Sequence, residues 1–300
     1  MPEPQKQARI VERRVVVRGT PTRVLEVDGD GPPVLLLHGF TDSADSWRPL
    51  LRELAARSRR AVAVDMPGSG WAAPMGRPAL RSLDDFAAAF LDAFGEGSAV
   101  VAGNSLGGLV AFRAARDGHP ALRGIVGIGP AGFKYGARLV YLEQLCRWTR
   151  GFDPILDPLL APLDHLVLPA FMVRLNAARM YHHLLARGRA EASLGRHYAS
   201  HLRTMRDLSR IRSDLVALGM DDRADPLDLS EIATPVLLIW GRHDRLALIE
   251  GAQLVIDALP ETRLIALDAG HCPQVEVPAD IADMIVEFAA APRAVAAAGS

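Results

Sequence analysis

The sequence predicts an α/β fold: a mostly parallel sheet of eight strands, flanked by helices and carrying one helical insertion. Short runs rich in Val, Leu and Ile alternate with segments of helical periodicity over most of the chain, a pattern typical of βαβ units. The alternation stops between residues 133 and 226, where only helical patterns occur. We therefore expect residues 1–132 and 227–300 to form a core domain and residues 133–226 to be an inserted helical cap.

The eight strand runs differ in how they are expected to pair. The first two, 15–18 and 24–27, flank the turn-forming residues Gly19-Thr20-Pro21 and are expected to be antiparallel. The third, 33–37, is continuously apolar, as strands buried on both faces are. The remaining strand runs are 61–64, 99–102, 124–128, 235–240 and 262–267. Helices of the core are expected at 46–57, 82–94, 106–116, 249–259 and 279–290.

Composition excludes several classes of protein. The 34 Lys and Arg residues are balanced by 35 Asp and Glu residues, and nucleic acid is not expected as a partner because phosphate binding needs a basic excess. No stretch approaches the roughly 18 apolar residues of a membrane span, and the N-terminus lacks the apolar run of a secretion signal. We therefore expect a cytoplasmic protein, and both a monomer and a homodimer remain open.

The two cysteines, Cys146 and Cys272, form neither a Cys-x-x-Cys pair nor a Cys/His ligand pattern. Neither a disulfide framework nor a zinc site is therefore indicated, and a reducing compartment fits this cysteine usage. We expect no metal and no cofactor.

A glycine-rich string, Gly103-Asn104-Ser105-Leu106-Gly107, stands between a predicted strand and a predicted helix. This is the context in which G-x-S-x-G forms a sharp turn that exposes a nucleophilic serine at the positive end of a helix. The alternative is a turn that only binds phosphate or packs tightly. That alternative is disfavoured because no Lys follows, as it would in a P-loop, and no G-x-G-x-x-G precedes the helix.

Four further motifs occur at the ends of predicted strands: His38-Gly39-Phe40, Asp65-Met66-Pro67-Gly68, Gly241-Arg242-His243-Asp244 and Gly270-His271. With these motifs in this order, the chain resembles the α/β-hydrolase superfamily over nearly its whole length outside the insertion. The resemblance implies the eight-stranded sheet of that family, a Ser-acid-His catalytic triad and a nucleophile elbow. It says little about the substrate.

The nucleophile expected from the resemblance is Ser105, and a serine at neutral pH needs a hydrogen-bonded base. His271 is the expected base among the nine histidines, because it follows the last strand at the edge where loops of parallel strands converge. His243 is the rival, but it lies beside Asp244 after an earlier strand.

The third member of the triad is expected to be Asp244, which follows the strand 235–240 and could orient the imidazole. Asp65 and Asp268 are the alternatives. Asp65 belongs to a turn motif whose usual role is structural, and Asp268 is too close in sequence to reach round the imidazole.

The resemblance also implies an oxyanion hole made by the backbone N–H groups of Phe40 and Leu106. Fixed amides of this kind face the oxygen that becomes negative in a tetrahedral intermediate, and losing one typically costs about 3 kcal/mol of barrier. His38 is expected to shape the loop that presents Phe40 and not to take part in the chemistry.

The insertion is expected to choose the substrate, since caps close over the strand ends. An apolar run at 155–175 suggests a small acyl or ester substrate with a hydrophobic body, contacted by Phe40 from the core; the alternative is that this run only packs the cap on the core. The residues expected to contact substrate from the run are Leu160, Leu163, Phe171 and Met172. Arginines of the second half of the insertion could face inward and bind a carboxylate, or form a solvated helix face. These arginines are Arg174, Arg179, Arg187, Arg189, Arg196, Arg203, Arg206, Arg210 and Arg212.

The expected activity is hydrolysis of a carboxylic ester through an acyl-enzyme on Ser105. Serine at this position disfavours dehalogenase and epoxide hydrolase chemistry, in which this superfamily attacks with aspartate. The string around Ser105 is also similar to hydrolases that cleave carbon–carbon bonds of ring-fission products, although Phe40-Thr41-Asp42 and Cys272 depart from that pattern. Acyl transfer to another acceptor and a receptor without turnover are further alternatives.

Overall fold

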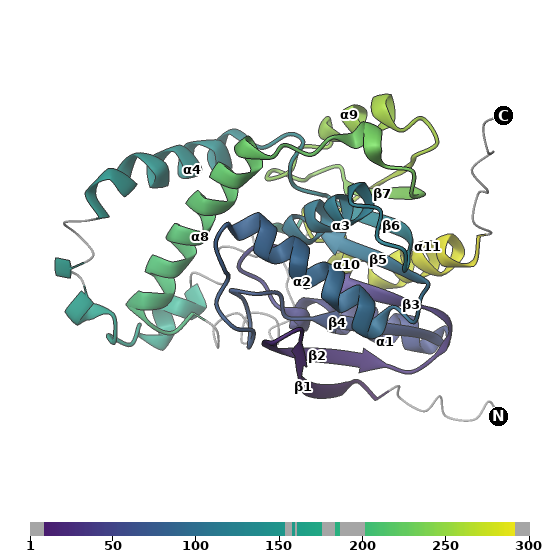
Figure 1. Ribbon diagram of the computed structural model, residues 1–300, viewed down its shortest axis with the longest axis horizontal. Coiled ribbons are helices and arrows are strands. Elements are labelled where there is room, and N and C mark those ends of the chain that lie inside the picture. The colour runs from purple at the N-terminus through teal and green to yellow at the C-terminus, as the bar shows by residue number, and fades with distance from the viewer. Residues whose placement is uncertain (1–8, 154–157, 160, 176–183, 187–201, 292–300) are drawn as a thin grey trace.

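A twisted sheet of eight strands forms the centre of the computed structural model, which describes residues 9–153, 158–159, 161–175, 184–186 and 202–291 (Figure 1). The strand order across the sheet is β1-β2-β4-β3-β5-β6-β7-β8. The strands are β1 (Val11–Val17), β2 (Thr20–Val27), β3 (Asp30–Leu37), β4 (Arg59–Val64), β5 (Ala99–Asn104), β6 (Leu122–Ile128), β7 (Val236–Gly241) and β8 (Arg263–Leu267). The predicted fold class is confirmed.

Six of the strands run parallel, and the predicted antiparallel start is present. β1 pairs antiparallel with β2, β2 pairs antiparallel with β4, and every other neighbour is parallel. The register places Leu37 of β3 beside Gly103 of β5, and Asn104 beside Ile128 of β6. The carboxyl ends of the central strands therefore meet at one edge of the sheet, where loops can bring distant residues together.

Helices cover both faces of the sheet (Figure 1). The core helices are α1 (Arg48–Ala56), α2 (Ala79–Phe94), α3 (Leu106–Arg116), α9 (Gly251–Ala258), α10 (Pro273–Glu276) and α11 (Pro278–Ala290). Successive strand residues alternate between two apolar clusters: Leu35 and Leu37 pack with α2 and α3, whereas Leu36 packs with α1 and α11. This alternation follows from the period of two along a strand. The central strands are buried on both faces, and their backbone can hold site residues firmly.

The described residues between β6 and β7 are mainly helical, with loops and the isolated bridge residues Tyr135 and Val167 outside the helices. This segment contains α4 (Ala137–Thr149), α8 (Met205–Ala224) and the short 3-10 turns η2 (Arg150–Phe152), η3 (Ala161–Leu163) and η4 (Leu229–Glu231). α4 and α8 lie against each other and extend from one end of the sheet (Figure 1). Thr204 and Asp207 form a capping box that starts α8. No helix within the described ranges combines the length and hydropathy of a bilayer span.

Candidate active site

Ser105 lies at a sharp turn between β5 and α3, with backbone φ of 53° and ψ of −115°. A Cβ on Gly103 would come 2.2 Å from the carbonyl oxygen of Gly107, and a Cβ on Gly107 would come 2.1 Å from that of Leu37. Only glycine fits at these two positions, because real Cβ atoms do not approach backbone so closely. The turn holds Ser105 in a region of backbone space that costs roughly 1–3 kcal/mol, and the surrounding packing has to supply this energy.

Asn104 joins the serine turn to the loop that follows β8. Its side-chain amide donates to the carbonyl oxygen of Ile128 at 3.0 Å and to that of His271 at 2.9 Å. The residue before the serine therefore fixes the position of the predicted base. The sequence interpretation assigned Asn104 no role, because its partner lies 167 residues away in the chain.

His271 and Asp244 form a buried pair. The Nδ1 atom of His271 lies 2.7 Å from Oδ2 of Asp244, and both residues are almost completely buried. The other oxygen of Asp244 accepts the backbone N–H groups of Leu246 at 2.8 Å and Ala247 at 3.0 Å. These contacts leave Nδ1 as the hydrogen donor to the carboxylate and Nε2 free to accept a proton.

The rival base and acids have other partners. His243 pairs with Asp268 at 2.7 Å, with side chains that are 55% and 72% exposed. Asp65 is fully buried, and its carboxylate accepts hydrogen bonds from Arg23 at 2.9 Å and from the backbone N–H of Trp71 at 2.9 Å. Of the candidates weighed, only Asp244 reaches the imidazole of His271 in the described structure.

The loop after β3 lies against the serine turn. His38 is fully buried; its Nδ1 donates to the carbonyl oxygen of Gly39 at 2.8 Å, and its Nε2 accepts the backbone N–H of Met66 at 2.9 Å. Both ring nitrogens are thus used to fix the loop, in agreement with the structural role expected of His38. A Cβ on Gly39 would lie only 3.4 Å from Cβ of Ser105, so the following residue, Phe40, begins close to the serine.

Two backbone N–H groups, those of Leu106 and Phe40, lie in the chain where they could bind an oxyanion beside Ser105. Leu106 is the first residue of α3, and the first N–H groups of a helix have no partner within it. Phe40 follows Gly39 and, like Leu106, lines the same cavity as Ser105. Their assignment as an oxyanion hole remains a prediction.

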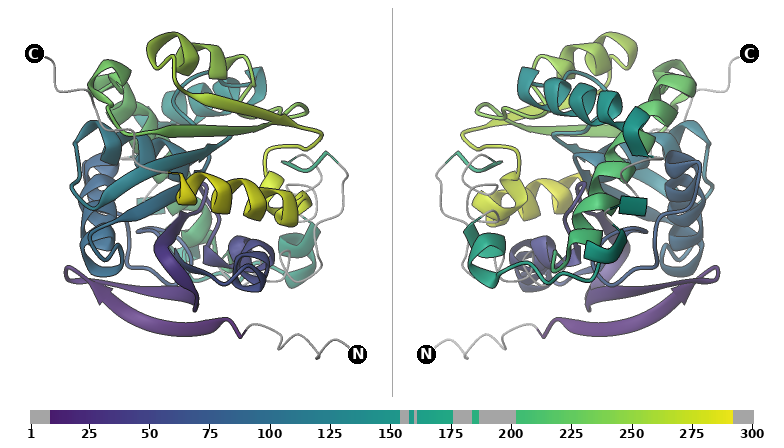
Figure 2. Two further views of the ribbon diagram at one scale, coloured as in Figure 1. Left: turned by 90° about the vertical axis from the view of Figure 1, so that its right-hand side faces the viewer. Right: turned by 90° about the vertical axis from the view of Figure 1, so that its left-hand side faces the viewer.

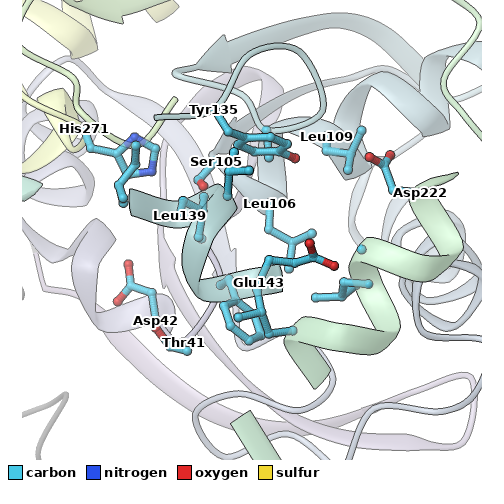
Figure 3. A pocket seen from close by; sticks show the side chains of 18 of the residues that line it. Thr41, Asp42, Ser105, Leu106, Leu109, Tyr135, Leu139, Glu143, Asp222 and His271 are labelled. Carbon is cyan, nitrogen blue, oxygen red and sulfur yellow. The ribbon is translucent and has the colours of Figure 1, made fainter. Parts of the chain in front are cut away.

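A cavity of about 540 Å³ opens above Ser105 and His271, and Figure 3 shows both side chains at its wall. Phe40, Leu106 and Leu109 line its base from the core side. α4 and α8 contribute much of the remaining wall, with one face of each helix turned inward. These residues are Leu139, Val140, Glu143, Gln144 and Arg147 from α4, and Leu215, Leu218, Gly219, Asp222 and Arg223 from α8.

The residues predicted to contact substrate from the insertion do not line this cavity where the structure describes them. Leu163, Phe171 and Met172 are 41%, 70% and 52% exposed and are not part of the cavity wall; Leu160 lies outside the described residues. The helical periodicity of α4 and α8 turns a different set of side chains toward Ser105. Contact of the apolar run with substrate therefore stays a prediction, and an apolar run is not necessarily a buried one.

The predicted inward-facing arginines also differ from those observed. Arg212 is held by Asp153 at 2.5 Å, and none of the described members of the predicted set lines the cavity. The cavity arginines are Arg147 and Arg223 instead, and Arg223 is neutralised by Glu143 at 2.8 Å. Arg179, Arg187, Arg189 and Arg196 lie outside the described residues.

Burial disfavours charge at several groups around the cavity. It raises the pKa of Asp42 and of Asp222 above the usual range for a carboxyl. Burial, with the nearby Asp222, raises the pKa of Tyr135 to about 12. It also raises the pKa of the Cys272 thiol well above its usual value. Cys272 therefore stays protonated and is not a competing nucleophile. Among the described residues, no group of His, Cys, Asp and Glu could hold a metal ion.

Comparison with known proteins relates most of the chain to one family. A family model described as alpha/beta hydrolase fold matches residues 32–278. The pimeloyl-[acyl-carrier protein] methyl ester esterase of Xanthomonas campestris pv. campestris is 29% identical over 277 residues, which cover 89% of this chain and 98% of that protein. The dihydrolipoyllysine-residue acetyltransferase component of the acetoin cleaving system of Cupriavidus necator is 26% identical over 263 residues. That match covers 87% of this chain and only 64% of the relative's length.

A solved structure shares the architecture. The 2-hydroxy-6-oxo-6-phenylhexa-2,4-dienoate hydrolase of Rhodococcus sp. strain RHA1 superposes with a TM-score of 0.74, covering 95% of this chain and all of that one, at 19% identity. At this identity the likeness shows the common fold alone.

Proposed function

The chain belongs to the α/β-hydrolase fold family, and we propose that it is a serine hydrolase of carboxylic esters with a hydrophobic body. The relatives within this family support hydrolysis as the class of reaction. The observation that carries the finer assignment is the buried 2.7 Å bond between His271 and Asp244, at the wall of the cavity that Ser105 also lines.

In the proposed reaction, the Oγ atom of Ser105 attacks the acyl carbon of the ester while Nε2 of His271 takes its proton. Asp244 holds the imidazole by Nδ1 and stabilises the positive charge that forms on it. The imidazolium then gives its proton to the leaving alcohol, and an acyl-enzyme remains on Ser105. Water, activated by the same imidazole, releases the acid and restores the serine.

The negative oxygen of the tetrahedral intermediate would lie between the N–H groups of Phe40 and Leu106. The first turn of α3 adds the positive end of its helix dipole at this point. Each amide would contribute about 3 kcal/mol to lowering the barrier. No metal or cofactor enters this reaction.

The helical segment between β6 and β7 would serve as the cap that selects the substrate. Its α4 and α8 supply apolar wall residues such as Leu139, Leu215 and Leu218, which suit an acyl chain. The ion pair of Glu143 with Arg223 also lines the cavity. Figure 3 shows the carboxyl groups of Glu143 and Asp222 at its wall. A substrate with an apolar body and a polar far end would match both kinds of surface.

A panel of p-nitrophenyl esters of increasing acyl length tests this proposal. Hydrolysis with a preference for medium chains, abolished in Ser105→Ala, supports the assignment. If a 2-hydroxy-6-oxo-dienoate is consumed faster than every ester, the activity would instead be carbon–carbon bond hydrolysis. Product partition toward an added alcohol would indicate acyl transfer instead. A stable ligand complex without turnover of any substrate would indicate a receptor.

A further inference from the structure

The outward face of α4 is apolar, which is the reverse of an ordinary surface helix. None of the residues of α4 is buried. Tyr141, Leu145, Trp148 and Phe152 follow one another at helical spacing, and Tyr141 and Trp148 are 67% and 70% exposed. The rings of Trp148 and Phe152 contact each other edge to face. A continuous apolar stripe that faces water instead of the core indicates a surface that binds another molecule or a membrane.

A second apolar segment lies on the same side of the molecule. In the run after η3, Val173 is buried beside Cys272 and anchors the chain. Its neighbours Phe171, Met172 and Leu175 are exposed. The right-hand view of Figure 2 shows α4 and this run on the face turned to the viewer, with α8 between them. We call this the apolar face. It consists of Tyr141, Leu142, Leu145, Trp148, Phe152, Leu166, Val167, Phe171, Met172 and Leu175.

Basic side chains outnumber acidic ones near this face among the described residues. Arg138, Arg147 and Arg174 are exposed, and no acidic side chain of the described residues forms an ion pair with them. Of the nearby acids, Glu143 and Asp153 are neutralised by Arg223 and Arg212, and Asp164 lies within the run itself between Leu163 and Leu166. Exposed aromatic and aliphatic side chains bordered by arginines are the composition of a helix that lies in the interface of an anionic bilayer.

We propose that the apolar face docks on the surface of an anionic lipid bilayer. The opposite face of α4 lines the cavity above Ser105, and Val140, which precedes Tyr141 of the apolar face, lines the cavity and is 39% exposed. A hydrophobic molecule could therefore pass from the lipid to the cavity without crossing water. A second copy of the chain is a poorer occupant, because a two-fold interface would bring the same arginines of both copies together.

Co-sedimentation of the full chain with vesicles tests this proposal. We expect binding to vesicles of equal parts phosphatidylglycerol and phosphatidylcholine, and weaker binding to phosphatidylcholine alone. The double variant Tyr141→Gln/Trp148→Gln removes apolar area without adding charge and should bind at least about tenfold more weakly. Arg138→Gln and Arg174→Gln should each weaken binding to the anionic vesicles roughly fivefold.

The matched control is Leu254→Gln, which changes an exposed apolar residue of α9 in the same way. It should bind like the wild type, and near-UV circular dichroism checks that each variant is folded. Absence of binding to anionic vesicles would overturn the proposal, as would equal losses in the control and the double variant. A dimer in light scattering that the double variant dissociates, without vesicle binding, would assign the face to a second copy. Ser105→Ala should bind normally, so this test is independent of the proposed hydrolysis.

Discussion

Asp244→Asn changes one oxygen of the site and should abolish most activity without disturbing the fold. The Leu246 and Ala247 amides donate to Oδ1 of Asp244, and they will hold the remaining oxygen of asparagine in that place. The new NH₂ group then points at Nδ1 of His271, where the carboxylate now lies at 2.7 Å. It must donate to Nδ1, which forces the ring proton onto Nε2.

In that tautomer the imidazole cannot accept the serine proton. Loss of the correct tautomer costs a serine hydrolase about 10⁴-fold in turnover, or about 5.4 kcal/mol of barrier. We therefore expect kcat for a p-nitrophenyl ester to fall by about that factor, with a melting temperature close to that of the wild type.

Asp268→Asn provides the matched control, because Asp268 makes the same 2.7 Å contact with His243 at the surface. Such an exposed pair is worth little, and activity should stay within about twofold of the wild type. If Asp244→Asn keeps full activity, or if Asp268→Asn loses as much, the reasoning about the acid is refuted.

Three further substitutions or reactions follow from the same structure. Gly107→Ala should leave little folded, active protein, since its Cβ would lie 2.1 Å from the carbonyl oxygen of Leu37; wild-type expression and activity would contradict this. Asp84→Ala should lower the free energy of unfolding by about 1–3 kcal/mol in urea titrations, because it removes the buried 2.8 Å partner of Arg113 and leaves Asp225 as the remaining carboxylate on that guanidinium; a loss below about 0.5 kcal/mol would count against this. Cys272 should react with iodoacetamide at least about tenfold more slowly in native than in unfolded protein, because burial raises the pKa of its thiol; equal rates would show that the thiol is accessible.

The fold could be predicted because its signals are local. Apolar strand runs, the tight turn that the structure places at Arg18-Gly19 and the glycines around Ser105 each constrain their own backbone. Element ends were less predictable where a distant residue sets them. α2 begins at Ala79 and not at residue 82, since the carboxylate of Asp221 in α8 accepts the backbone N–H of Leu80 at 3.1 Å. No residue near Leu80 in the sequence indicates that Asp221 is its hydrogen-bond partner.

Local signals could likewise predict the candidate triad residues, but not the residues of the cavity wall. Ser105, His271 and Asp244 each belong to a motif at a strand end, and parallel strands bring such ends to one edge. The cavity wall depends instead on which face of α4 and of α8 turns inward. Both faces of α4 carry apolar residues, so periodicity could not choose between them. The division into a core of residues 1–132 and 227–300 and a cap of 133–226 stays a prediction.

Labelling with a fluorophosphonate tests the central claim most directly, since this probe reacts far faster with a serine whose hydroxyl is activated by a base than with an ordinary serine. Mass spectrometry of the digested protein should find the adduct on the peptide that contains Ser105, and His271→Ala should abolish it in a folded protein. An adduct on another residue, or undiminished labelling of Ser105→Ala, would contradict the account.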